Sequence, residues 1–376
     1  MLKKFLFLAV LLSGLLSFSQ SPRLSSSTEV SVFTCGRGEE LYSTFGHTAL
    51  RIKDPVNQLD VVYNYGYFDF RTENFYFKFV KGDLQYFMNV TSYEDFVFEY
   101  QNDQREVIEQ TLNLPLFKKQ ELFDALNKDL QSEKRFYTYK FIDRNCTTMI
   151  VEKINELYGK ETIQKVDDKS ISYRTLLYPY FENYFWYKLG INIVFGAKTD
   201  AKAEKLFLPT ELMHSLDKAK FDGNPLVSNT KTVVIGENIQ PQFSFSNSIY
   251  LICVILLVLI IINKRFLFNS YLFFSGLLGL MLCLIGFYSD HQELLWNYNA
   301  LLFNPLFVLV PFVRSNFLKK LNVTLLIMLL IYSIIIITKP HLTIMYPFIL
   351  ANAYMLLKLM NRNPLGLLPF VKKNRA

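Results

Sequence analysis

The feature that most constrains this chain is the distribution of its apolar residues. Hydrophobic residues make up 51% of the 376 residues. The long apolar runs are confined to the first 20 residues and to the part after about Ser248. The stretch between them resembles an ordinary globular sequence rich in Tyr and Phe. We therefore expect a globular domain attached to a membrane part, because one soluble globule would not separate its residues in this way.

The first 19 residues have the pattern of a secretory signal peptide. Two lysines precede an apolar run from Phe5 to Phe18. The small residues Ser17 and Ser19 stand at the minus-three and minus-one positions of a cleavage site before Gln20. The alternative is an uncleaved anchor, although the run is short for a spanning helix. The sequence therefore predicts that the following domain is exported.

Five later segments are long and apolar enough to span a bilayer. They cover residues 248–263, 268–288, 299–313, 321–338 and 342–360. With the exported domain outside, the basic residues beside these segments fall on the inner side, and only Lys339 falls in an outer loop. We therefore expect a multi-pass protein of the bacterial inner (cytoplasmic) membrane, with a periplasmic amino-terminal domain and a cytoplasmic carboxyl terminus.

Charge argues against a nucleic-acid partner. The chain carries a net charge of +7. Residues 21–247 contain 27 basic and 31 acidic side chains, which gives −4, so the positive excess belongs to the ends and to the membrane part. A nucleic-acid-binding domain would need a clustered positive face on its soluble part.

The exported region reads as an α+β domain. Short strands are expected over residues 30–35, 45–53, 59–66, 75–80, 84–90 and 136–141. Helices are expected after Ser92, over Lys118–Gln131 and after Asn145, which is a plausible N-cap. Residues 170–215 suggest a helical extension. The expected organisation is a signal peptide (1–19), a periplasmic domain (20–221), a linker (222–247) and a transmembrane part with a basic tail (248–376).

A thiol and an imidazole outside the membrane could form a catalytic pair. Cys146 stands at the start of an expected helix, where the helix dipole and the free N–H groups favour a thiolate and an oxyanion. His47 opens an expected strand and could take the thiol proton. Asn64, on the next strand, is the candidate that orients the imidazole ring.

Other interpretations of the exported cysteines stay open. Cys146 could be an inert core thiol. Cys35 is also exported, so it could be the nucleophile itself or form a disulfide with Cys146. No metal-binding or cofactor-binding motif is evident, and we expect neither group.

The combination of motifs resembles a known family. The order of a His on a strand followed by Asn-Cys at the start of a helix resembles circularly permuted papain-like proteins. More specifically, the chain resembles the Lnb N-terminal periplasmic domain family, over about residues 28–230. The matching residues are Phe45–Arg51, Tyr63–Gly66, Phe68–Phe70, Asn145–Thr148, Tyr173–Arg174, Trp186, Phe195–Gly196, Asp200 and Phe207–Pro209.

This resemblance implies an activity. Lnb-type enzymes move an acyl chain of a diacylglyceryl lipoprotein onto the amine of its amino-terminal cysteine. The expected function is therefore a membrane-bound cysteine acyltransferase that uses a Cys146 acyl-thioester, with lipoproteins, phospholipids and membrane lipids as partners. The alternatives are a cysteine peptidase or amidase acting on peptidoglycan or exported proteins, and a non-catalytic lipid-binding or lipoprotein-binding protein. Substrate contacts are expected from Arg51, Tyr65, Arg144 and Asn145, although structural salt bridges with Asp69 or Asp143 are equally compatible with the two arginines.

Overall fold

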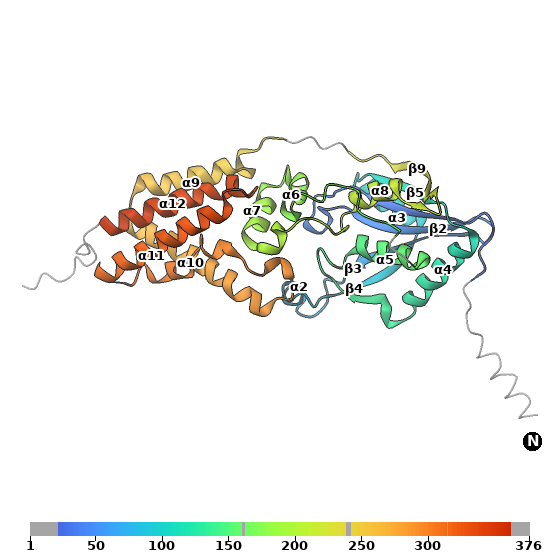
Figure 1. Cartoon of the computed structure of the whole chain (residues 1–376), viewed down its shortest axis with the longest axis horizontal. Helices are drawn as coiled ribbons and strands as arrows, with labels where there is room; N and C mark the ends of the chain where they lie inside the picture. Colours follow the sequence, from blue (N-terminus) through green and yellow to red (C-terminus); the bar gives the residue numbers. More distant parts are fainter. Residues whose placement is uncertain (1–21, 160–161, 238–241, 314, 362–376) are drawn as a thin grey trace, which may run out of the picture.

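The computed structural model describes residues 22–159, 162–237, 242–313 and 315–361. A domain built on a β-sheet occupies one end of the elongated molecule, and long apolar helices occupy the other (Figure 1). The expected signal peptide, Arg314 and the expected basic tail beyond residue 361 lie outside the described residues.

The domain contains a seven-stranded antiparallel sheet with the strand order β6-β4-β3-β2-β1-β5-β9. Most of the expected strands are confirmed. Residues Val227–Val234, expected in the linker, instead form the edge strand β9. Backbone pairing with β5 holds this strand in place, although most of its side chains are exposed. The strands are β1 (Glu29–Cys35), β2 (His47–Asp54), β3 (Leu59–Tyr67), β4 (Gln85–Ser92), β5 (Val107–Leu112), β6 (Phe136–Thr138) and β9, and β7 (Lys220–Phe221) and β8 (Asn224–Pro225) form a separate pair.

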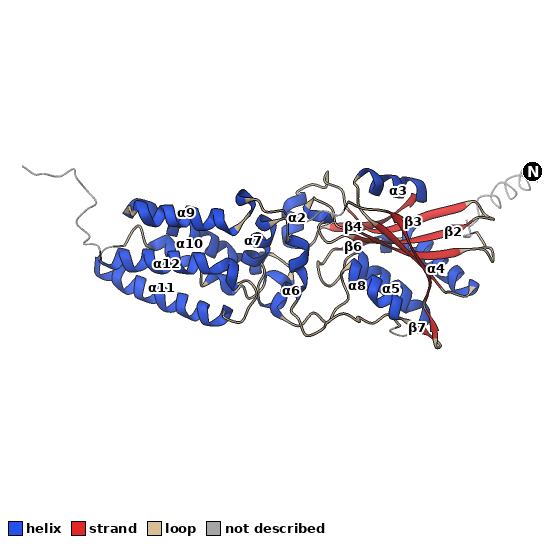
Figure 2. Ribbon diagram, turned by 90° about the horizontal axis from the view of Figure 1, so that it is seen from above, coloured by secondary structure: helices blue, strands red, loops and turns tan. Residues whose placement is uncertain are grey.

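Helices cover both faces of the sheet, with α3 on one side and α5 and α8 on the other (Figure 2). Leu122 and Leu126 of α4, and Ile150 and Ile154 of α5, repeat at a spacing of four and are buried in one core. The expected Ser92 cap is confirmed, because its side chain accepts the N–H of Asp95. These helices are α3 (Tyr93–Asn102), α4 (Leu116–Leu130), α5 (Cys146–Tyr158) and α8 (Pro209–Lys218).

Residues 75–80 form a helix, so the expected strand there is wrong. Helix α2 (Phe75–Lys81) ends at Gly82, whose φ of +79° lies in the left-handed region and whose N–H bonds to the carbonyls of Lys78 and Phe79. The aromatic residues of this segment favour a strand, but strand preference is weak when tertiary contacts oppose it. Here the contacts come from residues 288–291, which bond to the backbone of α2.

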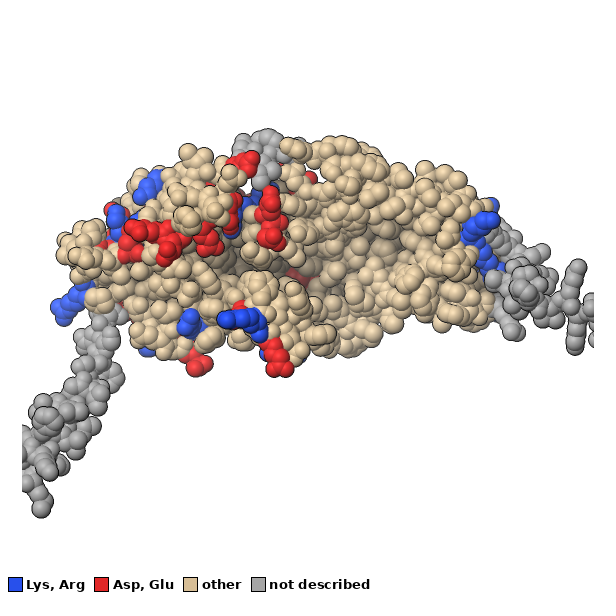
Figure 3. Space-filling model, turned by 180° about the vertical axis from the view of Figure 1, so that it is seen from behind, with Lys and Arg blue, Asp and Glu red and all other residues tan. Residues whose placement is uncertain are grey.

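Three helices are long and apolar enough to cross a membrane: α10 (Arg265–Tyr288), α11 (Ser315–Ile336) and α12 (Leu342–Asn361). Helix α9 (Ile249–Ile262) is apolar but shorter. Figure 3 shows charged side chains over the sheet domain and at the far tip of the helices, with a broad region free of them between. The helical extension between the two parts consists of α6 (Tyr173–Leu177) and α7 (Phe185–Val194).

Residues 299–313, expected as the third span, form short 3₁₀ turns instead of a long helix. Two glycines of α10 provide a groove for this segment. A side chain at Gly276 would meet the backbone of Val308, and one at Gly279 would collide with the carbonyl of Phe303. Pro305 also suits the first turn of a short helix better than a helix interior. The 3₁₀ turns of the described chain are Leu41–Ser43, Glu133–Arg135, Tyr178–Phe181, Ala197–Asp200, Phe245–Asn247, Gln292–Leu294, Tyr298–Ala300 and Pro305–Leu309.

The same segment nevertheless runs antiparallel along α10. Leu295 lies beside Gly286 near the end of α10. Further along, the Phe312 ring lies 6.1 Å from the ring of Phe273, in the first half of α10. The segment therefore follows α10 from Gly286 back to Phe273, a little over half of the helix.

Buried polar contacts join the sheet domain to the nearby ends of the long helices. Arg174 is fully buried and donates to Asp200 at 2.8 Å. Asp200 also accepts the hydroxyl of Tyr298 at 2.5 Å and the ammonium group of Lys339 at 3.0 Å. Lys339 therefore lies at the end of the helices that faces the domain.

Candidate active site

Cys146 is the first residue of helix α5, and Asn145 holds the helix start in place. The Asn145 side chain accepts the N–H of Thr148 at 3.0 Å, and the Thr148 hydroxyl accepts the N–H of Asn145 at 2.8 Å. The Asn145 amide also donates to the carbonyls of Phe141 and Phe207, both at 2.9 Å. Because the first N–H groups of a helix have no acceptor within it, those beside the Cys146 thiol are available to an oxyanion.

His47 and Asn64 come from neighbouring strands and contact each other. The His47 Nε2 lies 3.3 Å from the Asn64 Oδ1. The Asn64 amide nitrogen donates to the Val62 carbonyl and to the Thr91 hydroxyl, which directs the amide oxygen towards the imidazole. His47 Nε2–H is therefore the donor to Asn64, and Nδ1 is left for the thiol of Cys146.

The thiol and the imidazole meet over Gly66 of β3. A Cβ atom on Gly66 would lie 3.8 Å from both the Cys146 Cβ and the His47 Cε1. Gly66 has a φ of +105°, which side-chain-bearing residues rarely adopt. The strand therefore leaves space beside the pair where a reacting group can stand.

The environment of Cys146 favours its thiolate. Burial, the largest single influence, raises the pKa of the Cys146 thiol, but the charge and the hydrogen bond of His47 together with hydrogen bonds from the Thr48 backbone and Thr147 outweigh it. The pKa of Cys146 therefore lies below the ordinary thiol value. A thiolate beside an imidazolium is the reactive form of a nucleophilic cysteine.

Cys35 lies in a different environment. Its side chain is buried against α3, and that burial raises the pKa of the thiol to about 12 despite a hydrogen bond with Tyr100. Both Cys35 and Cys146 are free thiols in the structure. Of the two exported cysteines, only Cys146 therefore has the properties of a nucleophile.

Tyr137 is a residue near the pair that the sequence did not suggest. Its hydroxyl lies 4.0 Å from the Cβ position on Gly66, and the side chain is only 2% exposed. This hydroxyl has no hydrogen-bond partner among the described residues. A buried hydroxyl without a partner is uncommon and is free to donate to a reacting group.

The expected substrate-binding residues lie in different surroundings. Arg51 is buried between Asp60 at 2.6 Å and Glu109 at 3.0 Å, over the ring of Tyr93. Neither of its partners is Asp69 or Asp143. Asn145 makes the contacts at the helix start described above, and Tyr65 is buried in the core. Arg144 is the exposed member of the group, with its guanidinium 5.6 Å from the centre of the Tyr137 ring.

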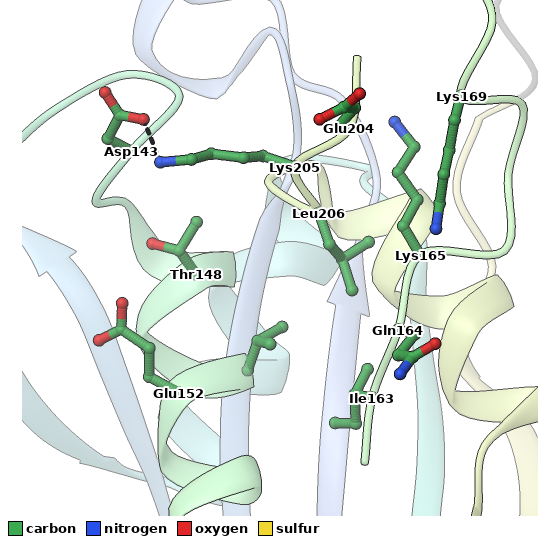
Figure 4. Close-up of a pocket in the computed structure, with 11 residues that line it drawn as sticks. Asp143, Thr148, Glu152, Ile163, Gln164, Lys165, Lys169, Glu204, Lys205 and Leu206 are labelled. Atoms are coloured by element: carbon green, nitrogen blue, oxygen red, sulfur yellow. Dashed lines mark hydrogen bonds and ion pairs between the residues drawn. The ribbon is translucent and has the colours of Figure 1, made fainter. Parts of the chain in front are cut away.

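A separate cavity of about 430 Å³ lies beside α5 (Figure 4). Thr148 and Glu152 of α5 line it together with Lys165 and Lys205, and Lys205 forms an ion pair with Asp143. The lining includes neither Cys146 nor His47. We therefore locate the candidate chemistry at Gly66 and not in this polar cavity. Among the described residues, no three His, Cys, Asp or Glu side chains are grouped as metal ligands would be.

Comparison with known proteins gives one family match. Residues 20–178 match the Lnb N-terminal periplasmic domain family. The match contains the strand of His47, the strand of Asn64 and the start of α5, and it covers less than half of the chain. No curated protein and no solved structure matches the chain. The Lnb domain and three helices of membrane-spanning length together indicate a membrane protein with a periplasmic domain.

Proposed function

We propose that this protein is a cysteine acyltransferase that moves an acyl chain of a diacylglyceryl lipoprotein to the amine of the lipoprotein's amino-terminal cysteine. The observation that carries the proposal is Cys146 at the start of α5, with a lowered pKa, beside a His47 ring held by Asn64. The Lnb family match supports the reaction class. The apolar helices support a substrate that resides in the bilayer.

The first half of the reaction transfers the acyl chain to the enzyme. The Cys146 thiolate attacks the carbonyl carbon of the ester, and the negative charge moves to the carbonyl oxygen. The N–H groups at the start of α5 and the Tyr137 hydroxyl stabilise this oxyanion. The C–O bond then breaks, and the His47 imidazolium gives its proton to the departing alkoxide. A lyso-lipid and a Cys146 thioester remain.

The second half transfers the chain to the amine. The neutral α-amine of the lipoprotein attacks the thioester carbon, and neutral His47 takes a proton from the attacking nitrogen. The C–S bond breaks, the amide forms, and Cys146 returns as a thiolate beside the imidazolium. Asn64 keeps the imidazole ring in the orientation that both transfers need.

The proposal includes a permuted papain-like fold and five membrane passes. His47 on a strand and Cys146 at a helix start, in this chain order, support the permuted arrangement. The antiparallel path of residues 299–313 along α10 supports a third pass. Lys264, Lys319 and Lys358, at the helix ends far from the sheet domain, support a cytoplasmic side there and a periplasmic side at Lys339.

Mass spectrometry of lipoprotein amino-terminal peptides tests the function in cells without other enzymes of this activity. Cells with the wild-type chain should contain lyso-form N-acylated lipoproteins, and cells with Cys146→Ala should retain diacyl lipoproteins with a free amine. Identical lipoproteins in both strains would contradict the proposal. A change in muropeptides alone would favour the amidase alternative.

A further inference from the structure

A group of exposed aromatic side chains lies on and around α2, on the periplasmic domain. We define the aromatic patch as Tyr42, Phe70, Tyr76, Phe77 and Phe79. Each of these side chains is at least 40% exposed, and Tyr76 and Phe77 reach 74% and 69%. Scattered exposed apolar residues are ordinary, but a contiguous group of this kind marks a binding surface.

Helix α2 is fixed to the end of α10 by hydrogen bonds to its backbone. The Tyr288 hydroxyl donates to the Phe77 carbonyl at 3.2 Å, and the Ser289 hydroxyl donates to the Val80 carbonyl at 2.6 Å. The N–H of Asp290 bonds to the Lys81 carbonyl at 2.7 Å. Because Tyr288 is the last residue of α10, a helix long and apolar enough to cross a membrane, we infer that α2 lies at the level of the membrane surface.

The composition of α2 suits that level. Its sequence, Phe75–Lys81, combines four aromatic residues with Lys78 and Lys81. Aromatic rings are favoured where hydrocarbon meets headgroups, and lysines attract anionic lipid headgroups. The outer leaflet is therefore the partner that matches both the position and the chemistry of the patch.

A continuous series of aromatic contacts leads from the patch towards Cys146. Phe68 follows Gly66 by two residues, and its ring lies 4.9 Å from that of Phe70 and 6.0 Å from that of Tyr42. The ring of Phe75, at the start of α2, lies 5.7 Å from that of Phe68. Aromatic contacts thus extend from α2 to Phe68, two residues after the Gly66 that lies beside Cys146.

We propose that the aromatic patch inserts into the outer leaflet of the membrane and admits acyl chains along Phe68 to Cys146. Insertion is argued from the exposure, position and composition of the patch, and admission of acyl chains rests in addition on the proposed acyl transfer. The patch keeps the ester bond of a lipid near the thiol while its chains remain in apolar surroundings.

Fluorescence quenching tests insertion in the full chain. Phe77→Trp is placed in a Trp186→Phe, Trp296→Phe background and reconstituted in bilayers containing lipids brominated near the headgroup. The matched control is Phe98→Trp, because Phe98 is 71% exposed but lies on α3, on the sheet domain away from the helices. We expect loss of emission at position 77 and none at position 98. Equal quenching at the two positions, or none at 77, would overturn insertion.

A kinetic comparison tests the admission of acyl chains. The Tyr76→Ser, Phe77→Ser double variant should lose acylation of Cys146 by a diacyl lipopeptide in bilayers and keep acylation by a water-soluble short-chain thioester. Phe98→Ser should change neither rate. Equal loss with both donors would overturn the admission route. Absence of acylation in the wild-type chain would instead refute the proposed function, and the quenching result would still decide insertion.

Discussion

At the residue scale, the reactivity of Cys146 depends on a small number of contacts that compete with burial. Burial alone would raise the pKa of the thiol, as it does for Cys35. The contacts with His47 and the Thr48 backbone reverse this direction at Cys146. The pKa values of the two thiols therefore differ because the contacts of Cys146 outweigh its burial, whereas the hydrogen bond of Tyr100 and the charge of Arg105 do not outweigh the burial of Cys35.

The first prediction concerns the pH dependence of thiol alkylation. The lowered pKa keeps wild-type Cys146 a thiolate at a pH where an ordinary thiol is protonated. His47→Ala removes both the charge and the hydrogen bond, so we expect the midpoint of iodoacetamide alkylation to move to higher pH by one unit or more, on the order of 1.4 kcal/mol per unit. Peptide mass spectrometry follows Cys146 separately, with buried Cys35 as the internal control. An unchanged midpoint would refute the pairing.

The second prediction separates catalysis from stability at Tyr137. Tyr137→Phe removes a buried hydroxyl without a partner, so thermal stability should be kept or should rise, by up to about 1 kcal/mol. The turnover number should fall on the order of 10²-fold if the hydroxyl donates to the oxyanion.

The matched control for this prediction is Tyr158→Phe. The Tyr158 hydroxyl also lacks a partner among the described residues, but Tyr158 lies at the far end of α5, roughly 20 Å from Cys146. Its turnover number should be unchanged. An equal effect of the two substitutions would remove Tyr137 from the mechanism.

Sequence reasoning identified the residues of the site that lie in motifs and missed the one that does not. Cys146 at a helix start, His47 on a strand and Asn64 on the next strand can be read from local pattern. Tyr137 could not, because β6 reaches the site only through its pairing with β4, at the edge of the sheet. Nothing in a three-residue strand indicates which hydroxyl lacks a partner.

At the scale of elements, the start of α5 determines the position of the thiol. Asn145 accepts one hydrogen bond within the helix and donates two to the carbonyls of Phe141 and Phe207. The cap therefore ties the helix to the preceding loop and to the segment before α8.

The third prediction uses Asn145 to test this arrangement. Asn145→Ala should destabilise the domain by about 2 kcal/mol or more, because a cap is lost and two buried carbonyls lose their donor. Asn145→Asp keeps an acceptor for the cap but places a negative charge beside Cys146, so the alkylation midpoint should rise. Thermal unfolding and alkylation measure the two effects. A midpoint that falls in Asn145→Asp would contradict the assigned electrostatics.

Elements with a regular pattern were predictable, and elements shaped by distant contacts were not. The periodicity of α4 and the caps of α3 and α5 are local features, and the structure confirms them. Helix α2 depends on α10, which lies about 200 residues later, so no local window of sequence contains both partners and local preference gave a strand. Residues 299–313 follow α10 closely in sequence, but they pack against Gly276 and Gly279, a three-dimensional fit that apolar composition alone does not show.

At the scale of the whole molecule, the sheet domain is held against the membrane helices by buried charge. Asp200 joins Arg174 of the domain to Lys339 between α11 and α12. Removing one member of a buried ionic group leaves the others without a counter-charge. The contact therefore holds the sheet domain against the ends of α11 and α12.

The fourth prediction tests this buried ionic contact. Asp200→Asn should lower the thermal stability of the detergent-solubilised chain markedly, with a loss of stabilising free energy on the order of 3–5 kcal/mol. The control is Glu156→Gln, which removes an ion pair between Lys153 and an exposed carboxylate and should cost under about 1 kcal/mol. Equal melting temperatures for the two variants would contradict a stabilising role of Asp200.

The central claim is that an acyl chain resides on Cys146 during the reaction. The most direct measurement is mass spectrometry of the Cys146 peptide from full-length protein mixed with a diacyl lipopeptide in bilayers. We predict an added acyl mass on Cys146 that neutral hydroxylamine removes and that an added α-amine acceptor discharges. An unmodified Cys146 under turnover, together with full activity in Cys146→Ala, would contradict the account.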